Sequence, residues 1–509
     1  MRTQSGVWQL PARREPSLTG SDEFIFLSEK GSLKSFGWDG EGKGKLWRYN
    51  QHYFDDLNAR GAWSRKTWHE ALLMDWVAQN PAGQGSGWEP YPTSLRIVNW
   101  IKWSLAGNHL PPDCIDNLAV QARWLMKRLE FHLLGNHLFA NAKALVFVGA
   151  FFEGVESGKW LAKGMQILSC EVSEQILDDG GHFERSTMYH ALALEDMLDL
   201  LNLSQLYSKP FCRYGDQIRE WRKKIPAMID WFKAMSHPDG EIGFFNDSAF
   251  EIAPAGGEIK DYSSKLGFNL RSEKESCSWM KQSGYVRLAT ENAVALLDMA
   301  PVGPNYLPAH AHADTLSFEL SVFGQRLLVN SGTSCYGTSN ERLRQRGTPA
   351  HNTVTLNEEN SSDVWGGFRV ARRARPINLE VDLLGQIKRA QAGHDGYERL
   401  DGKPIHNRRW EMEEDNLTVI DTVSSKKVYS YARFHFHPNL TIEVLDKTSQ
   451  SEGLILLPSG KQVYWTISKG EGRLTDSTWH PVFGTSLLNK VLSVKLDDSQ
   501  SKVQFFWAT

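Results

Sequence analysis

Hydrophobic and polar residues follow two different periods along the chain. From about residue 65 to residue 236, apolar residues recur at three- and four-residue spacing, as in Leu194, Met197, Leu198 and Leu201. This spacing is typical of amphipathic helices. It predicts helices over residues 67–79, 94–106, 114–133, 137–153, 158–177, 187–207 and 214–235. Short connections that carry Gly, Pro and Asn separate these segments, as they do between antiparallel helices.

After about residue 280 the period changes to two. The alternation predicts strands over residues 285–297, 315–328, 352–356, 417–423, 431–437, 454–457, 462–467 and 491–495. Helices and strands in separate blocks predict an all-helical domain followed by an antiparallel β domain. We place an N-terminal extension or cap at residues 1–64, the helical domain at residues 65–270 and the β domain at residues 271–509.

Length and composition fit this division. A chain of 509 residues is too long for one ordinary core, and 41% hydrophobic with 23% charged residues is typical of a globular protein. No apolar run reaches the roughly 18 to 20 residues that a membrane span requires, so we expect no membrane span. Indole stacks well on sugar rings, but we expect most of the 19 tryptophans to fill the core.

The cysteines and the N-terminal residues bear on the compartment. The five cysteines are widely spaced without a CxxC motif, which suits a reducing compartment and argues against a Cys-rich zinc site. The first twenty residues contain no apolar block of signal-peptide length. We therefore expect a cytoplasmic protein, or a periplasmic or secreted one if the chain is a mature form.

Basic residues occur in two local runs, although the net charge is −3. Neither run lies in a recognised nucleic-acid module, so we expect no nucleic-acid partner. We interpret both as contacts for the carboxylates or sulfates of a substrate, with a solvated face as the alternative. The runs are Arg342, Arg344 and Arg346, and Arg369, Arg372, Arg373 and Arg375.

The densest cluster of titratable residues is Pro308-Ala-His310-Ala-His312-Ala-Asp314. Alternation predicts a strand with His310, His312 and Asp314 on one face and the alanines on the other. Histidines two residues apart can share a metal, or one can bind metal while the other acts on a substrate. A solvated strand edge is the structural alternative.

Two downstream segments complete a candidate metal site. Residues 327–336 read as an apolar strand that ends in a polar, glycine-bearing turn, and His351 opens another strand. His312, Asn330 and His351 would together offer two nitrogens and one oxygen to zinc or a similar divalent ion. Asp314 would orient one of the imidazoles from behind.

Two segments of the helical half also carry polar groups at helix starts. They are Gly135-Asn-His-Leu-Phe-Ala-Asn141 and Asp178-Asp-Gly-Gly-His-Phe-Glu-Arg-Ser-Thr-Met-Tyr-His190. Asn136, and Ser186 or Thr187, could simply cap the helices that follow. Asn, His and Tyr side chains at helix N-termini on one rim of a helical toroid would instead face an incoming carboxylate.

These motifs resemble the heparinase II/III group of polysaccharide lyases, whose relatives include alginate lyases and dermatan sulfate epimerase. The resemblance implies an incomplete (α/α) toroid followed by an antiparallel, multi-sheet β-sandwich. The matching segments keep the family's order and span most of the chain. They are GNHLFAN at 135–141, DGGHFERSTMYH at 179–190, HAHAD at 310–314, VNSGTSCYG at 329–337 and HNTV at 351–354.

The resemblance also implies roles for single residues. Asn136 and His137 would neutralise a uronate carboxylate, and Tyr189 would act as base, acid or both. His310 would be the catalytic histidine of the β domain, with Tyr336 as a further active-site tyrosine.

The metal-binding histidines of the family correspond to His312 and His351, and the ion would be zinc or calcium. The family usually has Asp where this chain has Asn330. A neutral amide oxygen is a poorer zinc ligand than a carboxylate.

The implied activity is β-elimination on an anionic polysaccharide or oligosaccharide that contains uronic acid. One alternative is a polymer-level uronate C5-epimerase, which removes the same proton but returns it to the opposite face. A second alternative is a glycan-binding relative that has lost catalysis, which the Asn330 departure favours. Retention of His137, Tyr189 and His310 argues against a mere binder.

Overall fold

The computed structural model describes residues 1–40, 42–268 and 276–508. The chain divides into two compact units, and each combines separate stretches of sequence. The helical unit comprises Met1–Ile176, Ala191–Ile229 and Glu251–Leu270, and the β unit comprises Leu177–His190, Asp230–Phe250 and Arg271–Thr509. The predicted boundary between residues 270 and 271 lies outside the described residues.

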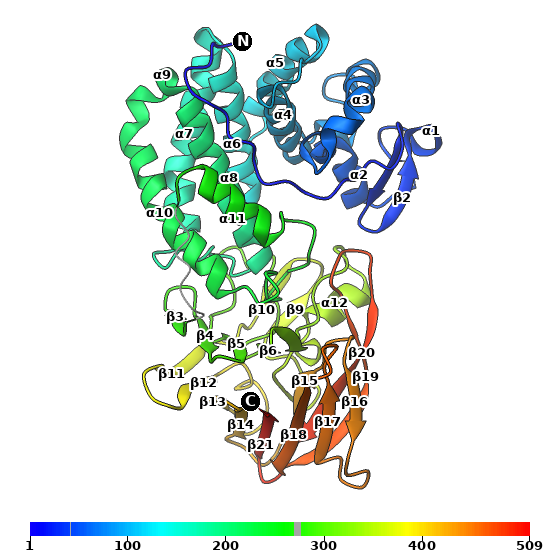
Figure 1. The fold of residues 1–509 in the computed structure, drawn as a ribbon, viewed down its shortest axis with the longest axis vertical. Coiled ribbons are helices and arrows are strands. Elements are labelled where there is room, and N and C mark those ends of the chain that lie inside the picture. The colour runs from blue at the N-terminus through cyan, green and yellow to red at the C-terminus, as the bar shows by residue number, and fades with distance from the viewer. Residues whose placement is uncertain (41, 269–275, 509) are drawn as a thin grey trace. The chain divides into compact units, whose positions relative to one another are not determined.

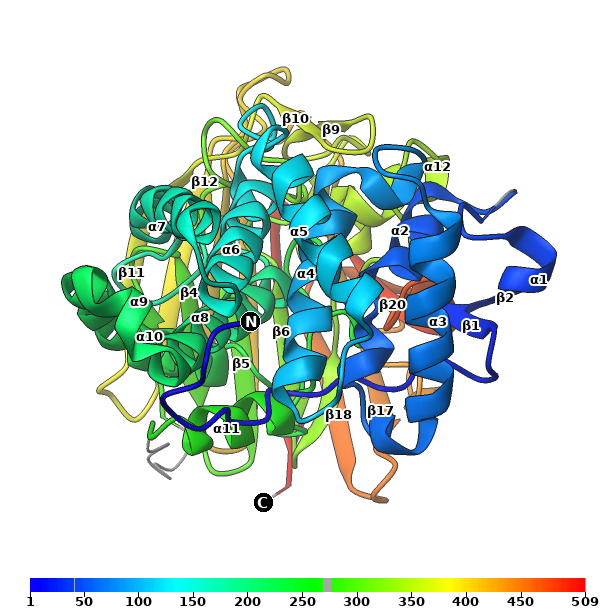
Figure 2. The same ribbon diagram turned by 90° about the horizontal axis from the view of Figure 1, so that it is seen from above.

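All seven predicted helices are present, together with shorter elements that were not predicted. From α3 (Lys66–Gln79) to α10 (Gly215–Ala234) they run across the view from right to left in Figure 2. The last turn of α10 and the first turn of α8 belong to the β unit. The described elements of this part of the chain are β1 (Glu23–Phe26), β2 (Glu29–Ser32), α1 (Leu33–Phe36), α2 (Lys45–Tyr53), η1 (Asp55–Asn58), η2 (Ala62–Arg65), α3 (Lys66–Gln79), η3 (Ser86–Trp88), α4 (Pro90–Leu105), α5 (Pro112–Met126), α6 (Gly135–Phe151), α7 (Val155–Gln175), α8 (Thr187–Leu206), α9 (Ser208–Phe211), η4 (Cys212–Tyr214), α10 (Gly215–Ala234) and α11 (Gly256–Lys265).

The helix predicted to end at residue 133 ends at Met126. The chain then turns to brace α6, because Asn141 accepts a hydrogen bond from the backbone N–H of Glu130 (2.8 Å) and donates one to its carboxylate (2.9 Å). Helix α6 is buried over almost its whole length. A helix that is apolar all round belongs to the interior of its domain.

A buried charge cluster ties α4, α6 and α8 together. The carboxylate of Asp199 accepts from the ammonium groups of Lys102 and Lys143, the latter at 2.5 Å, and from the hydroxyl of Tyr262 at 3.0 Å. Asp199 is fully buried. Charges are tolerated in such a place only when they are paired.

The described strands of the β unit form antiparallel sheets, seen in the lower part of Figure 1. One sheet has the order β3 (Ser278–Met280), β4 (Tyr285–Ala289), β5 (Ala293–Asp298), β6 (Phe318–Val322), β7 (Gln325–Leu328). A longer one has the order β11 (Pro376–Asp382), β12 (Lys388–His394), β13 (His406–Met412), β14 (Asn416–Val423), β21 (Gln500–Trp507), β18 (Gln462–Lys469), β17 (Glu452–Leu456), β16 (Thr441–Val444). The remaining strands pair as β19 (Glu471–Trp479), β20 (Leu487–Lys495), β15 (Ser430–His435), β8 (Val354–Leu356), and as β10 (Arg369–Ala371) with β9 (Asp363–Trp365).

Facing side chains of these sheets form one apolar core that includes Phe318, Phe434 and Trp410. Two segments predicted as single strands, 285–297 and 315–328, are instead the hairpins β4–β5 and β6–β7. In β6–β7 the turn falls at Phe323 and Gly324, both with positive φ. The apolar pattern runs through such a short turn, so periodicity alone does not reveal it. Among the described residues, no helix is both long and apolar enough to cross a bilayer.

Candidate functional site

A buried carboxylate, Asp247, organises the polar centre of the β unit. It accepts from Nδ1 of His310 at 2.9 Å and from Nε2 of His312 at 2.8 Å. The guanidinium of Arg342 binds both of its oxygens, Nη2 at 2.7 Å. Burial alone would raise the pKa of Asp247, but Arg342 and the two imidazoles hold this pKa well below its usual range. The carboxylate is therefore ionised, and it fixes the positions of the two imidazoles and of the Arg342 guanidinium.

The contact with Asp247 sets the tautomer of His310. A carboxylate only accepts, so Nδ1 of His310 carries a hydrogen and Nε2 is the basic nitrogen. The carboxylate of Glu184 lies 4.0 Å from Nε2. His310 therefore has the orientation of a general base or acid that a buried carboxylate supports.

Two tyrosines complete this centre. The ring of Tyr189 lies against the imidazole of His310, with centroids 4.0 Å apart, and its hydroxyl is 3.0 Å from the hydroxyl of Tyr336. Burial raises the pKa of Tyr336 well above its ordinary value. Tyr336 thus keeps its proton and can donate to its partner. The structure brings together Tyr189, Tyr336 and His310, which were predicted from separate motifs.

Local structure positions Tyr189 at the start of α8. The hydroxyl of Ser186 accepts from the backbone N–H of Tyr189 at 3.1 Å, as an N-cap does, and donates to the carbonyl of Asp247 at 2.6 Å. The alternative that Ser186 caps this helix therefore holds together with the placement of Tyr189 in the site.

Two residues beside this centre have left-handed backbone conformations, Arg185 (φ 59°) and Asn246 (φ 57°). The side chain of Asn246 donates to the carbonyl of Arg185 at 2.9 Å and accepts from the backbone N–H of His312 at 3.0 Å. Asn tolerates this region better than Arg does. Such strain is kept where surrounding contacts fix a functional loop.

The segment His310–Asp314 is not the predicted strand but an irregular loop. Its backbone bonds to other loops: the N–H of Ala313 donates to the carbonyl of Arg346 (2.9 Å), and the carbonyl of His310 accepts from Asp247 (2.9 Å). The alanines are buried as well as His312 and Asp314. The solvated-edge alternative therefore fails, since both sides of the segment are packed.

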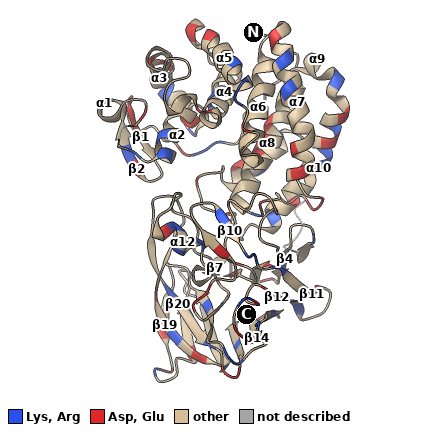
Figure 3. Cartoon of the chain, turned by 180° about the vertical axis from the view of Figure 1, so that it is seen from behind, with Lys and Arg blue, Asp and Glu red and all other residues tan. Residues whose placement is uncertain are grey.

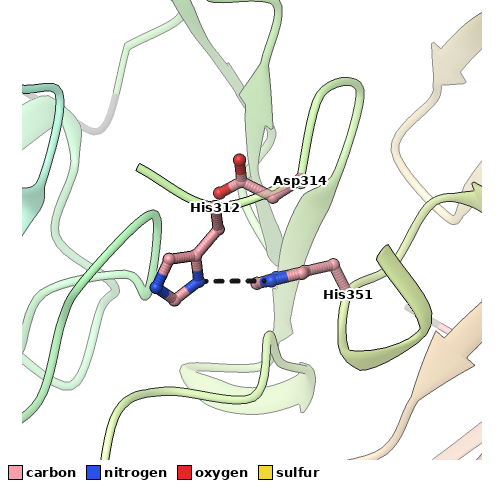
Figure 4. Close-up of side chains that lie close together, drawn as sticks. All are labelled: His312, Asp314 and His351. Atoms are coloured by element: carbon pink, nitrogen blue, oxygen red, sulfur yellow. Dashed lines mark hydrogen bonds between the residues drawn. The ribbon is translucent and has the colours of Figure 1, made fainter. Parts of the chain in front are cut away.

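His312, Asp314 and His351 form a cluster whose nitrogen and oxygen atoms lie within 4.8 Å of one another (Figure 4). Nδ1 of His312 is 3.3 Å from Nε2 of His351. Burial lowers the pKa of both imidazoles and raises that of Asp314. Because Nε2 of His312 donates to Asp247, its Nδ1 presents a lone pair to His351. Two facing imidazole nitrogens share either one proton or a cation, so these residues fit a bound metal.

A second buried cluster in the β unit also contains two histidines, a carboxylate and an arginine. It differs in how the nitrogen atoms of its histidines are satisfied. Nε2 of His406 lies 2.7 Å from Asp421, which Arg408 also binds, and its Nδ1 is 3.2 Å from Nε2 of His394. The backbone N–H of Gly396 donates to Nδ1 of His394 at 3.1 Å. Because Nδ1 of His394 accepts this bond, the hydrogen of His394 lies on Nε2 and is donated to His406. Each ring nitrogen of the two histidines therefore takes part in an ordinary hydrogen bond.

No such N–H donates to the ring of His351, because the backbone partner of this ring is the carbonyl of Gln345, which can only accept. In the His394–His406 pair, a hydrogen on Nε2 of His394 is required, and it completes the hydrogen bond between the two rings. At His351 no N–H requires a hydrogen on Nε2, so no proton has to lie between His312 and His351. This difference favours a cation at the latter pair.

Asn330 lies beside this cluster, fully buried. Its amide donates to the carbonyl of Phe244 (2.9 Å), and its side-chain oxygen accepts from the backbone N–H of Asn352 (3.1 Å). The second bond connects the glycine-bearing turn to the residue that follows His351. Its role as a metal ligand stays a prediction, while Asp314, expected behind the imidazoles, contributes an oxygen directly to the cluster.

For two of the three arginines in the first run, Arg342 and Arg346, the predicted substrate contact is wrong, because both are buried. Arg342 and Arg346 lie on helix α12 (Asn340–Arg346), whose basic residues are blue in Figure 3. Both are fully buried; Arg342 binds Asp247, and Arg346 donates to the carbonyl of Ala311 at 2.8 Å. Arg344 is exposed and pairs with Glu341.

Asn136 and His137 belong to the helical unit, in the first turn of α6. The helix begins at Gly135 after Leu134, so Asn136 is not its N-cap. Asn136 hydrogen-bonds the phenol of Tyr91, and the ring of His137 lies over that of Tyr91 with centroids 4.5 Å apart. Nδ1 of His137 is 3.1 Å from Glu130. The two side chains are thus held side by side at a helix N-terminus.

Sequence reasoning missed Asp247 and Glu184 as members of the site, and it gave Arg342 a substrate contact instead of the bond to Asp247. Glu184 stands inside a motif that was quoted without a role for it. Arg342 and Arg346 are four residues apart and share a helix face, a spacing that could have marked them as a buried pair. Asp247 carries no such signal, because it is a lone Asp in an irregular segment.

Two family models match the chain. The one described as heparinase II/III N-terminus matches residues 60–258, and the one described as heparinase II/III-like, C-terminal, matches residues 273–508. The two matches keep the order of the helical and β blocks and together cover most of the sequence.

Heparin-sulfate lyases are among the relatives in sequence. That of Bacteroides stercoris is 28% identical over 302 residues, which are 54% of this chain and 44% of that protein. That of Pedobacter heparinus is 24% identical over 445 residues, which are 74% of this chain and 63% of that protein. The matches therefore span less than two thirds of either relative.

Solved structures share the fold. The crystal structure of heparinase III aligns with a TM-score of 0.70 at 16% identity, over 91% of this chain and 76% of that one. A heparan sulfate lyase mutant from Pedobacter heparinus aligns with a TM-score of 0.65 at 18% identity, over 96% and 82%. This likeness confirms the predicted fold class, an incomplete (α/α) toroid followed by an antiparallel β-sandwich.

Proposed function

This chain belongs to the heparinase II/III family, and we propose that it is a polysaccharide lyase that cleaves a uronic-acid-containing glycosaminoglycan by β-elimination. The observation that carries the proposal is the set of Tyr189, Tyr336 and His310 gathered beside buried Asp247. A protein that only binds a polymer does not need such proton-transfer groups. The lyase names of the curated relatives support elimination over C5 epimerisation.

The carboxylate of the uronate must be neutralised first, because the proton on C5 is otherwise too weakly acidic. We assign this task to Asn136 and His137, whose side chains lie together at the start of α6. Donors that strengthen as the enolate develops are worth roughly 3 kcal/mol each.

Proton transfer falls to Tyr189 and His310. One of them takes the C5 proton, the C4–C5 double bond forms, and the C4–O4 bond breaks with its electron pair passing to O4. A protonated group then supplies the hydrogen that O4 requires. Asp247 stabilises His310 when it is charged, and Tyr336, which keeps its own proton, stabilises the oxygen of Tyr189.

We propose that His312, Asp314 and His351 hold a metal ion, which when bound would cross-link the loops that carry them. The two imidazoles favour zinc over calcium, since calcium prefers oxygen ligands. The ligands lie behind His310, on the far side of Asp247 along the chain of hydrogen bonds. The role is therefore structural. Loss of activity on metal removal with an unchanged fold would count against it.

The test is a screen of heparan sulfate, heparosan, chondroitin sulfate, hyaluronan and alginate for the ultraviolet absorbance of the new conjugated double bond. We expect wild type to raise the absorbance on at least one polymer and Tyr189→Phe to abolish it. Tyr429→Phe, at an exposed tyrosine far from the site in sequence, serves as the matched control. Solvent deuterium entering C5 of an intact polymer would instead indicate epimerisation, and no reaction at all would overturn the proposal.

A further inference from the structure

The hairpin β9–β10 forms one wall of a cavity next to the proton-transfer residues. The cavity has a volume of about 280 Å³, and its opposite wall is the segment that leads directly to His310. This volume is near the lower end of the roughly 300 to 1,000 Å³ of small-molecule sites. It suits one sugar ring. The lining includes Tyr306, Pro308, Trp365, Phe368 and Arg369.

Two large aromatic side chains of the hairpin are exposed. Trp365 is 56% exposed and Phe368 is 39% exposed, whereas most tryptophans of the chain are buried. The ring of Phe368 also reaches the site, with its centroid 5.7 Å from that of His310 and 5.2 Å from that of Tyr336. Exposed aromatic surface that continues a catalytic centre is typical of a binding surface, and indole presents a flat face to a sugar ring.

One cation of this wall is unused by the protein. Arg369 is exposed and lies directly opposite Trp365 in the strand pair. In the described part of the chain its guanidinium has neither a hydrogen bond nor an ion pair. The other arginines nearby are engaged: Arg372 binds Asp363, and Arg373 donates to the carbonyl of Asn305 at 2.9 Å. Arg369 is thus available for an anionic ligand.

Buried arginines of α12 fix the turn of the hairpin. Nε of Arg342 donates to the carbonyl of Gly367 at 3.1 Å, and Nη1 of Arg346 donates to the carbonyls of Gly366 (3.2 Å) and Gly367 (3.1 Å). The guanidinium that binds Asp247 therefore also holds the turn between Trp365 and Phe368. Such a surface is ordered before a ligand arrives, which lowers the entropic cost of binding.

We propose that this cavity is a subsite for the sugar unit next to the one that reacts, with the ring stacked on Trp365 and Phe368 and its anionic group bound by Arg369. The proposal rests on the proposed lyase function and deepens it. The anionic group is a sulfate or a carboxylate, because a guanidinium pairs with either through parallel hydrogen bonds.

The test compares Trp365→Ala and Arg369→Ala with Arg389→Ala, a control at an arginine of β12 that pairs with Glu411, on heparan sulfate and on heparosan, the unsulfated polymer of the same backbone. We expect the first two variants to raise KM about tenfold with little change in kcat, and Arg389→Ala to behave as wild type. An Arg369→Ala effect confined to heparan sulfate identifies a sulfate, and an equal effect on both polymers identifies a carboxylate. KM values within twofold of wild type for both test variants would overturn the subsite.

Binding separates this inference from the proposed function. Size-defined heparan sulfate oligosaccharides are titrated calorimetrically into Tyr189→Phe, alone and combined with Trp365→Ala or Arg369→Ala. Binding that weakens about tenfold in both combinations supports the subsite even if wild type cleaves nothing, in which case only the lyase proposal fails. Cleavage by wild type together with unchanged binding in both combinations sinks the subsite alone. Absence of both cleavage and binding overturns both.

Discussion

Nδ1 of His310 donates to the buried carboxylate of Asp247 at 2.9 Å, across 63 positions of sequence. The contact fixes which nitrogen of the imidazole is basic and stabilises its charged form. The same carboxylate binds Arg342, so it couples the stability of the β unit to the chemistry of the site.

Replacing Asp247 by Asn should affect both stability and catalysis. Arg342 then loses its counter-charge inside the protein, so we expect the free energy of unfolding to fall by about 3 to 5 kcal/mol. We also expect kcat to fall by roughly two to four orders of magnitude, because His310 loses its orienting acceptor. Urea unfolding and initial rates at a temperature where the variant is folded measure the two effects.

The matched control is Asp421→Asn, because Asp421 binds His406 and Arg408 in the same way. This substitution should lower the free energy of unfolding by a similar amount. It should leave kcat per folded molecule within about threefold of wild type, because effects at distant, unconnected sites are independent of one another. Equal losses of kcat in the two variants would argue that Asp247 acts only on folding.

The proposed metal should stabilise the β unit only through its own ligands. A ligand that binds the native state stabilises it by about 2.7 kcal/mol at a hundred times its Kd. We expect a chelator to lower the Tm of wild type and of His394→Gln, but not that of His351→Gln, which has already lost a ligand. Differential scanning calorimetry with and without added zinc checks this. A chelator shift that persists in His351→Gln would place the ion elsewhere.

The charge cluster of the helical unit should be costly to break. Asp199→Asn removes one of the two carboxylates that each lysine binds, while Lys102 keeps Glu195 and Lys143 keeps Asp196. We expect the free energy of unfolding to fall by about 3 kcal/mol, because the neutral amide replaces a charge that both buried lysines share. Glu156→Gln breaks an exposed pair with Arg123, and there we expect no more than about 1 kcal/mol. Equal effects in urea unfolding would mean that burial does not set the energy of these pairs.

Acid should destabilise the helical unit through His52. Burial and then the charge of Arg96 lower the pKa of His52 from 6.5 to about 3. Below pH 6.5 the unfolded chain binds a proton that the native state does not take up until about pH 3. The free energy of unfolding therefore falls as pH falls across this window, by up to about 1.4 kcal/mol per pH unit.

His52→Gln should flatten this slope, because glutamine can still accept the hydrogen bond that Trp76 donates to His52. His132→Gln, at an exposed loop position, should leave the slope unchanged. The measurement is urea unfolding at several pH values between 7 and 4. An unaltered slope in His52→Gln would show that other groups dominate.

Periodicity was enough to predict the helices of the first half and the β character of the second. It failed where the backbone partner lies far away in sequence. His310, His312 and Asp314 do converge, but on a loop held by Asn246 and Arg346 rather than on a strand. A two-residue alternation predicts which side chains point to the same side of the chain. It does not predict which groups the backbone hydrogen-bonds, and these partners decide between a strand and a loop.

The site residues that carried a family motif were predictable, whereas those identified only by their partners were not. Tyr189 and Tyr336 come from quoted motifs and lie 3.0 Å apart. Asp247 becomes significant only once Arg342 is placed beside it. A helical spacing of four could have paired Arg342 with Arg346, but it could not have named the carboxylate between the histidines.

The β unit is woven from three stretches of chain, and Tyr189 and Asp247 come from the two short ones. A fragment cut at the apparent boundary, from Arg271 onward, would keep Arg342 and His310 but lose the acid that neutralises the one and aligns the other. Domain dissection or swapping at that point would thus produce a sandwich with an orphaned guanidinium in its interior. The β unit therefore cannot be expressed as one continuous C-terminal segment, because part of its interior comes from residues that precede Arg271 in the sequence.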